Sequence, residues 1–290
     1  MPPDAVVGML PDSHGKLEVE HEVMLQKKLD ELKSRLRQMG RVAIAFSAGV
    51  DSTFLAKVAH DVLGNNMVAY TVQAGMVPER EIAFSREFCK LHGIPQQLIE
   101  VDEMQVEGFV ENSRERCYFC KRNLFSKIAE RAKAAGFSTV CEGSNADDIH
   151  DYRPGMRALQ ELGIRSPLLE CGLTKADIRE LSHQLDLPTW DKPSFACLAS
   201  RIPYGEPISR EKLSMVSNAE QLLFELGFKQ FRVRLHGNLA RIEVLPEDFN
   251  KVLEKRDQIL AAFKKIGFTY ISLDLQGFRS GSLNETLAAK

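Results

Sequence analysis

The chain contains no apolar run close to the roughly 20 residues that a membrane-spanning helix needs, so we expect no membrane partner. Its 290 residues carry a net charge of only −2, which argues against the broad basic surface typical of nucleic-acid-binding proteins. Residues 1–20 lack the basic and apolar segments of a secretory signal peptide. We therefore expect a flexible extension over residues 1–20 on a cytoplasmic protein.

Cysteine is scarce, and we expect no disulfide framework in a chain of this size without a secretion signal. There are six cysteines. Three of them, Cys89, Cys141 and Cys171, stand in or beside apolar stretches and are expected to pack as small hydrophobic side chains. Internal repeats and low-complexity tracts are also missing, which excludes solenoid and linker-like architectures.

The pattern of apolar residues predicts alternating strands and helices over the first two thirds of the chain. This alternation indicates an α/β fold with a doubly wound parallel sheet, in which ligands bind at the carboxyl ends of the strands. Helices are expected at 22–39, 54–62, 78–91, 121–135 and 174–185, and strands at 42–46, 67–72, 95–101, 138–142 and 166–169.

After residue 204 the order of elements changes to helix, two strands, helix and strand, with Gly237-Asn238 as a hairpin turn. The helices are predicted at 209–226 and 246–266, and the strands at 230–236, 239–245 and 269–276. We place a domain boundary here, with an α/β domain at residues 21–204 and a smaller α+β domain at residues 205–290. The long loop 188–201 between them has no clear period and is expected to be functional.

The sequence Ser47-Ala48-Gly49-Val50-Asp51-Ser52 joins the first predicted strand to a helix. Such a turn presents backbone N–H groups and a helix N-terminus, which together bind phosphate. Ser47, Gly49, Val50 and Ser52 are candidate nucleotide contacts, and Asp51 is a candidate magnesium ligand. An ordinary strand-to-helix turn with a Ser/Asp cap is the alternative.

This turn is not a Walker A loop, because it lacks the lysine of that motif. It resembles instead the Ser-Gly-Gly-x-Asp-Ser signature of the PP-loop ATP pyrophosphatases, which cleave ATP between its α and β phosphates. Ala48 replaces the first glycine of that signature, so we expect this position not to require a backbone angle that favours glycine.

A second polar turn, Gly143-Ser144-Asn145-Ala146-Asp147-Asp148, follows a predicted strand. Gly143, Asn145 and Asp147 are candidate nucleotide contacts there, although a polar turn that caps a helix would have the same composition.

Cys117, Cys120 and Cys197 allow several interpretations. Three thiolates can hold a [4Fe–4S] cluster and leave one iron open. They can also bind zinc with a fourth ligand such as His92 or His150. A single reactive thiol at Cys197, activated by Arg201, is a third interpretation, and three buried cysteines without chemistry are a fourth.

Arg232 and Arg234 alternate with apolar residues on the predicted strand 230–236, so they share one face of it. Bidentate contacts from these arginines would suit a phosphate or a carboxylate, whereas a solvated sheet face is the alternative. Glu220 and Glu243 are further candidates for contacts with metal or substrate.

The ordered set of motifs is similar to that of the LarE family of ATP-dependent sulfur transferases over roughly residues 22–280. The motifs are 47–52, 117–121, 142–148, 151–155, 173–175 and 190–205.

This resemblance implies that the chain uses ATP to adenylate a carboxylate of pyridinium-3,5-biscarboxylic acid mononucleotide and converts it to a thiocarboxylate. The product is a precursor of the nickel-pincer nucleotide of lactate racemase. One branch of the family sacrifices the sulfur of a single cysteine, here matched by Cys197. Another branch uses a [4Fe–4S] cluster on three cysteines to deliver sulfide. The presence of Cys117, Cys120 and Cys197 favours the cluster branch, which needs a sulfide source.

The family also places substrate-binding arginines on the strand of Arg232 and Arg234, and its members form hexamers, so a homo-oligomer is expected. Two rival functions remain open. A related tRNA thiolase would bind RNA in a salt-sensitive way. A zinc-stapled nucleotide sensor would bind ATP without releasing pyrophosphate.

Overall fold

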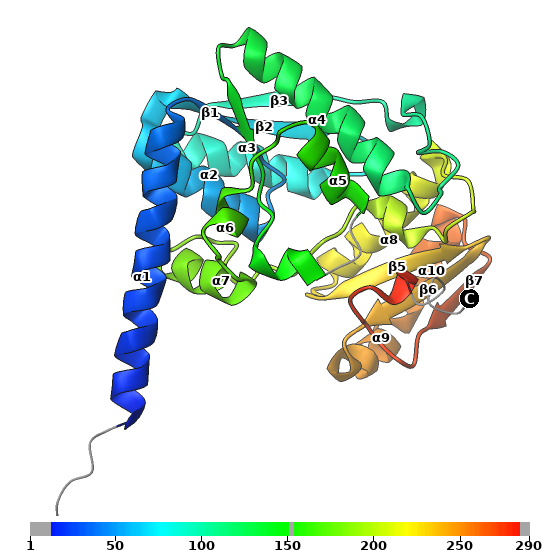
Figure 1. Cartoon of the computed structure of the whole chain (residues 1–290). Coiled ribbons are helices and arrows are strands. Elements are labelled where there is room, and N and C mark those ends of the chain that lie inside the picture. The colour runs from blue at the N-terminus through cyan, green and yellow to red at the C-terminus, as the bar shows by residue number, and fades with distance from the viewer. Residues whose placement is uncertain (1–12, 151–153, 285–290) are drawn as a thin grey trace, which may run out of the picture.

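The computed structural model describes residues 13–150 and 154–284. Within those residues, no helix combines the length and the apolar content that crossing a membrane requires. Two sheets organise the chain, and Figure 1 shows them in different parts of the molecule.

The first sheet has four parallel strands in the order β3-β2-β1-β4. They span Val42–Ala45 (β1), Met67–Gln73 (β2), Gln96–Glu100 (β3) and Thr139–Cys141 (β4). The connections run outward from β1 to β3 and then return to β4 on the far side of β1. The direction of winding therefore reverses between β1 and β4, where ligands of doubly wound sheets bind.

Helices cover both faces of this sheet, as the alternating side chains of β1 require. Val42 and Ile44 contribute to a core formed with α1, α2, α3, α6 and α7, whereas Ala43 contributes to a core formed with α4 and α5. The helices span Ser13–Met39 (α1), Val50–Leu63 (α2), Glu79–His92 (α3), Arg116–Ala134 (α4), Pro154–Glu161 (α5), Pro167–Glu170 (α6) and Lys175–Gln184 (α7). The α/β doubly wound sheet predicted from the sequence is thus confirmed.

The second sheet is mixed: β5 and β6 form an antiparallel hairpin, and β7 joins β6 in parallel. The strands are Phe231–His236 (β5), Leu239–Val244 (β6) and Tyr270–Leu273 (β7), and the helices are Arg210–Glu225 (α8), Phe249–Glu254 (α9) and Arg256–Ile266 (α10). Its apolar core also takes in Met76, Phe109 and Leu198 from earlier in the chain. The boundary near residue 204 stays a prediction, and the apolar core of the second sheet includes residues from both sides of it.

Several predicted elements differ from the structure. The strand expected at 166–169 is wrong, because Pro167 lacks a backbone donor and opens the short helix α6, leaving only an isolated bridge between Cys141 and Arg165. The helix expected at 246–266 is divided into a 3₁₀ turn, α9 and α10. The helix expected from residue 22 already begins at Ser13, so part of the predicted extension is helical, and residues 1–12 lie outside the described residues.

Helix α1 packs against α2 and α6 along its later turns, and its first turns extend beyond the rest of the molecule (Figure 1). Leu32 is fully buried, whereas Val23 is 64% exposed. We expect Leu32→Ala to lower the free energy of unfolding by about 2–5 kcal/mol, because it leaves a cavity in the core. Val23→Ala should change it by about 0.5 kcal/mol or less in the same denaturant titration. Equal effects of the two substitutions would contradict this packing.

Candidate active site

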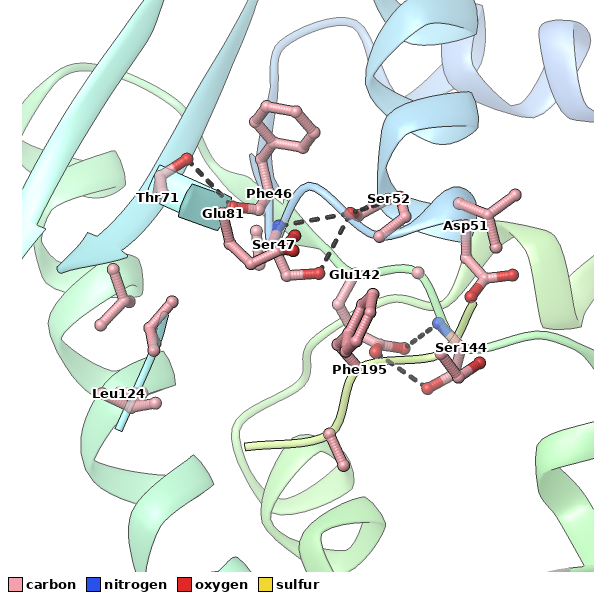
Figure 2. A pocket seen from close by; sticks show the side chains of 18 of the residues that line it. Phe46, Ser47, Asp51, Ser52, Thr71, Glu81, Leu124, Glu142, Ser144 and Phe195 are labelled. Carbon is pink, nitrogen blue, oxygen red and sulfur yellow. Dashed lines mark hydrogen bonds between the residues drawn. The ribbon is translucent and has the colours of Figure 1, made fainter. Parts of the chain in front are cut away.

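A cavity of ≈ 490 Å³ lies at the carboxyl ends of β1, β2 and β4. Its walls come from the turns after β1 and β4, the end of β2, the start of α3, helix α4, and the segment just before Cys197 (Figure 2). The first of these walls is polar and the α4 wall is apolar, with Leu124, Phe125 and Ile128. A cavity with one polar end and one apolar end suits a nucleotide, whose phosphates and base need different surroundings.

The turn after β1 leads directly into α2, as the sequence predicted. The hydroxyl of Ser52 accepts a hydrogen bond from the Ser47 N–H at 3.2 Å and lies 3.1 Å from the Ser47 hydroxyl. Gly49 is the N-cap of α2 and, having no side chain, it leaves the first helical N–H groups uncapped. Those groups have no partner inside the helix and are available to an anion.

Ala48 adopts a left-handed backbone conformation, with φ at 61°. The expectation that this position needs no glycine-favouring angle is therefore wrong. Ala48 is completely buried, so the packing around it holds a conformation that alanine adopts only at a cost.

Asp51 faces the cavity but is already paired. Its carboxylate accepts hydrogen bonds from the Lys175 ammonium and, at 3.3 Å, from the Asn145 amide. Gly143 brings the turn after β4 against this group, since a Cβ at Gly143 would stand 3.0 Å from the Ser52 nitrogen. The two predicted turns thus meet at the switch point of the sheet.

Asp147 and Asn145 do not line the cavity, although both were predicted to contact the nucleotide. Asp147 is exposed and accepts a hydrogen bond from the Lys175 N–H at 2.8 Å, so it holds the start of α7. Glu142 and Asp148 line the cavity instead. Glu142 is buried and accepts hydrogen bonds from the hydroxyls of Ser144 and Ser166, so it stabilises the turn after β4.

Cys117 and Cys120 lie in the first turns of α4, which starts earlier than predicted. Their spacing places them on one face of the helix, together with Lys121 and Leu124 one turn further on. Cys197 stands at the end of the segment whose preceding residues, Pro193 to Ala196, line the cavity. The cavity therefore connects directly with the segment that carries this cysteine.

The three thiols lie near one another. Burial raises the pKa of Cys120, and the neighbouring Cys197 and Cys117 raise it further. Cys197 as a whole is exposed, but the protein around its thiol removes water from it, and this desolvation raises the pKa of the thiol. The charge of Arg116 and the hydrogen bond from the Ala199 backbone lower the pKa by less. By contrast Cys89, Cys141 and Cys171 are buried, which confirms their expected packing role, and burial raises the pKa of Cys89 and of Cys141 to about 12.

The arrangement of these thiols decides which metal group they suit. Among residues 13–150 and 154–284, no three thiol, imidazole or carboxylate groups converge closely enough to hold a single ion. His92 packs on Phe88 beside α2, on the opposite face of the sheet from α4, and the His150 side chain lies outside the described residues. A zinc site is thus not favoured. A cluster is different, because each thiolate binds a different iron, so its ligands stand farther apart than those of one ion.

The guanidinium of Arg201 is bound by other side chains and is not free to activate the Cys197 thiol. Its guanidinium forms a buried ion pair with Glu220 at 2.6 Å, and it also donates to the Ser200 hydroxyl at 2.7 Å. Burial alone would raise the pKa of Glu220, but the charges of Arg201 and Arg232 outweigh it and the pKa lies below its usual range. Glu220 is therefore a counter-ion in the core and not a ligand facing the cavity, which corrects the sequence-based expectation.

Arg232 and Arg234 are likewise buried on β5. Arg234 is bound to Glu243, Ser200 and Ser282, so Glu243 is also a counter-ion. Arg232 donates to the carbonyl groups of Phe231 and Ser194, and burial beside the other arginines lowers its pKa to about 9. Within the described residues these carbonyls accept only some of the five N–H groups of the Arg232 guanidinium, so the others can donate to an anion.

Lys121 lines the cavity as well, although its sequence pattern indicated no role for it. Within the described part of the chain, its ammonium forms no hydrogen bond or ion pair. Its aliphatic chain passes close to Gly155 of α5, where a Cβ would come within 2.6 Å of Lys121 Cδ. The sequence feature that could have identified Lys121 is its position four residues after Cys117, which places it on the helix face that carries the thiols.

A comparison with protein-family models finds no match. The chain is 44% identical to an uncharacterised protein of Synechocystis sp., over 91% of this chain and 99% of that protein. It is 34% identical to the pyridinium-3,5-bisthiocarboxylic acid mononucleotide synthase of Lactiplantibacillus plantarum, over 91% of this chain and 96% of that enzyme.

More distantly, the chain is 25% identical to one of the subunits of the glutamine-hydrolysing GMP synthase of Thermoplasma volcanium, over 65% of each chain. This second kinship agrees with the PP-loop form of the turn after β1. Taken with the nearly full-length match to the synthase, it shows that the chain is an enzyme of the LarE family of sulfur transferases, within the PP-loop superfamily.

Proposed function

We propose that this enzyme uses ATP and Mg²⁺ to convert a carboxylate of pyridinium-3,5-biscarboxylic acid mononucleotide to a thiocarboxylate. The observation that carries the proposal is that the phosphate-binding turn and the segment leading to Cys197 line one cavity. A carboxylate activated at the turn after β1 would lie within reach of sulfur delivered from the segment that leads to Cys197. The 34% identity to a synthase named for the bisthiocarboxylic product supports this substrate.

The reaction needs two steps. In the first, a substrate carboxylate oxygen attacks the α-phosphorus of ATP, the bond to the β-phosphate oxygen breaks, and pyrophosphate leaves. In the second, hydrosulfide attacks the acyl carbon, AMP leaves with the original carboxylate oxygen, and a proton is released. The N–H groups at the start of α2 would bind the phosphates of ATP, and Asp51, released from Lys175, would hold Mg²⁺.

Cys117, Cys120 and Cys197 are the residues that would hold a [4Fe–4S] cluster, which supplies an open iron for an exogenous sulfide. Arg116 lies between Cys117, at 4.0 Å, and the Ala199 carbonyl, at 3.1 Å, so it ties the two cysteine-bearing segments together. Arg232, whose guanidinium keeps N–H groups beyond those bound to the carbonyls of Phe231 and Ser194, would bind the phosphate or a carboxylate of the substrate. Arg234 would act by positioning, because Glu243, Ser200 and Ser282 already bind its guanidinium. Arg201 would act through its hold on the Cys197 segment.

Two further expectations remain proposals. The enzyme is expected to form a homo-oligomer, hexameric as in its family. It is not expected to bind nucleic acids or membranes. Apolar residues on the outer turns of α1, such as Val23 and Met24, are exposed and would suit contacts with another copy of the chain.

The activity itself is tested with protein purified without oxygen and given ATP, Mg²⁺, the pyridinium substrate and sulfide. We expect substrate-dependent release of pyrophosphate and a product whose mass corresponds to replacement of oxygen by sulfur. ATP cleavage that responds to a tRNA and not to the pyridinium nucleotide would instead identify a tRNA-modifying enzyme. ATP binding without any pyrophosphate release would contradict catalysis altogether.

The sulfur route is tested by metal analysis. We expect about four iron atoms and matching acid-labile sulfide per chain, with broad absorbance at about 400 nm, and loss of the iron and of this absorbance in Cys117→Ala. Cys171→Ala is the matched control, because Cys171 is buried in the core on the other face of the sheet, and it should keep its iron. Iron-free native protein in which Cys197 loses the mass of one H₂S after turnover would show that this thiol is sacrificial.

The position of the Lys121 ammonium predicts a role in the adenylation step, where negative charge develops near the α-phosphate. We expect Lys121→Met to lower kcat for pyrophosphate release by about 100-fold, with little change in melting temperature. Lys133→Met, on the exposed face of the same helix, is the control and should leave kcat unchanged.

Gly155 provides a second test of the same residue. A methyl group from Gly155→Ala would push the Lys121 side chain aside and should lower kcat in the native background. In the Lys121→Met background the same change should have no further effect. Equal effects of Gly155→Ala in both backgrounds would show that it acts on helix α5 and not through Lys121.

A further inference from the structure

The left-handed Ala48 needs a physical explanation, because the phosphate-binding turn depends on its backbone direction. L-amino acids with a Cβ enter this region only at a cost, and they persist there when their surroundings hold them. The Ala48 side chain is buried in the main core. The carbonyl oxygen of Ala48 accepts a hydrogen bond from the ammonium of Lys192 at 3.0 Å.

Lys192 is itself held from three sides. Its ammonium is paired with Glu81 of α3 at 2.6 Å and lies 4.4 Å from the centre of the Phe84 ring. Its carbonyl oxygen accepts a hydrogen bond from Arg179 of α7 at 2.8 Å. The lysine side chain is only 18% exposed, so its contact with Ala48 is a fixed part of the structure and not a passing surface contact.

Lys192 belongs to the segment that carries Cys197. From Lys192 this segment continues along the cavity wall through Ser194, whose carbonyl binds Arg232, to Leu198, whose N–H donates to the Met76 carbonyl at 3.0 Å. One lysine therefore joins the backbone of the phosphate-binding turn to the segment bearing the cysteine.

We propose that Lys192 is a positioning residue that holds Ala48 in its left-handed conformation, and that it thereby couples the ATP-binding form of the turn to the position of the Cys197 segment. The charged hydrogen bond to the Ala48 carbonyl does at this site what a glycine would do by its own conformational freedom. Lys192 keeps the turn ready for phosphate before ATP arrives. The inference rests on ATP binding as part of the proposed function.

The direct test is a double-mutant cycle on ATP affinity, measured by calorimetry with Mg²⁺ and no other substrate. We expect Lys192→Met to raise the Kd for ATP about tenfold, because the turn loses a charged hydrogen bond. Lys192→Arg, which keeps a donor, should restore most of the affinity. In the A48G background, where position 48 reaches a positive φ without help, Lys192→Met should raise Kd by about twofold or less.

The rescue by A48G separates this role from a general loss of stability. Lys192→Met also removes the nearer of the two cations paired with Glu81 and leaves only Arg80 at 3.9 Å, so some destabilisation is expected in either background. Melting temperatures are recorded for each variant. Lys229→Met, an exposed lysine before β5, should leave the Kd for ATP unchanged. A tenfold loss that persists in the A48G background would overturn the proposal.

The coupling is tested on the cysteine segment itself. We expect bound ATP to change the rate at which iodoacetamide modifies Cys197 in cluster-free protein, followed by mass spectrometry, and Lys192→Met to abolish that change at saturating ATP. An ATP effect of equal size in the Lys192→Met variant would contradict the coupling. If the native chain binds no ATP at all, the proposed function fails, and that outcome is distinct from binding that ignores Lys192.

Discussion

The ion pair between Arg201 and Glu220 fixes the relation between the two parts of the active site. Both side chains are almost completely buried, at 1% and 0% exposure, and Glu220 also accepts the Val233 N–H at 3.0 Å. Such a pair adds little net stability over apolar residues, but leaving either charge alone in the core would cost about 3–5 kcal/mol. Because Arg201 also donates to the Ser200 hydroxyl, the pair determines where the turn after Cys197 lies on the small sheet.

Helix α4 provides the second constraint, through its periodicity. A single helical face carries the two thiols at its start, Lys121 after them, and the apolar wall of the cavity further along. Residues three and four apart on a helix are neighbours, so the order along the chain becomes an order in space. The two thiols, the Lys121 ammonium and the apolar wall therefore follow one another along α4, and the cavity begins at Lys121, one turn after Cys117.

Much of this arrangement could be predicted from the sequence. The parallel sheet and the turn after β1 follow from local signals: apolar runs, polar turns and helix caps, such as the Thr174–Asp177 capping box of α7. The false strand at 166–169 has a simple reason, since a short apolar run fits a strand or a helix and Pro167 decided for the helix. The pairing of β7 with β6 in parallel is a long-range contact that no local pattern specifies.

The roles of the charged residues were harder to predict, because they depend on partners far away in the chain. Alternation on β5 placed Arg232 and Arg234 on one face correctly, yet nothing in that strand indicated that Glu220 and Glu243 would be buried beside them. The same holds for Lys192, which meets Ala48 across 144 positions of sequence. Buried charges require partners, so a strand rich in arginine implies carboxylates nearby, but their identity comes only from the fold.

Ala48 shows how a departure from a family signature can be explained physically. Replacing glycine at a left-handed position by alanine raises the cost of that conformation, while the buried methyl group gains about 0.8 kcal/mol from packing. The cost, about 1–2 kcal/mol, is larger than this gain, so the exchange is favoured where the neighbouring carbonyl is held from outside. In this chain the holding group comes from the segment that bears Cys197, and the replacement of a glycine thereby makes the nucleotide turn and the sulfur-bearing segment depend on each other.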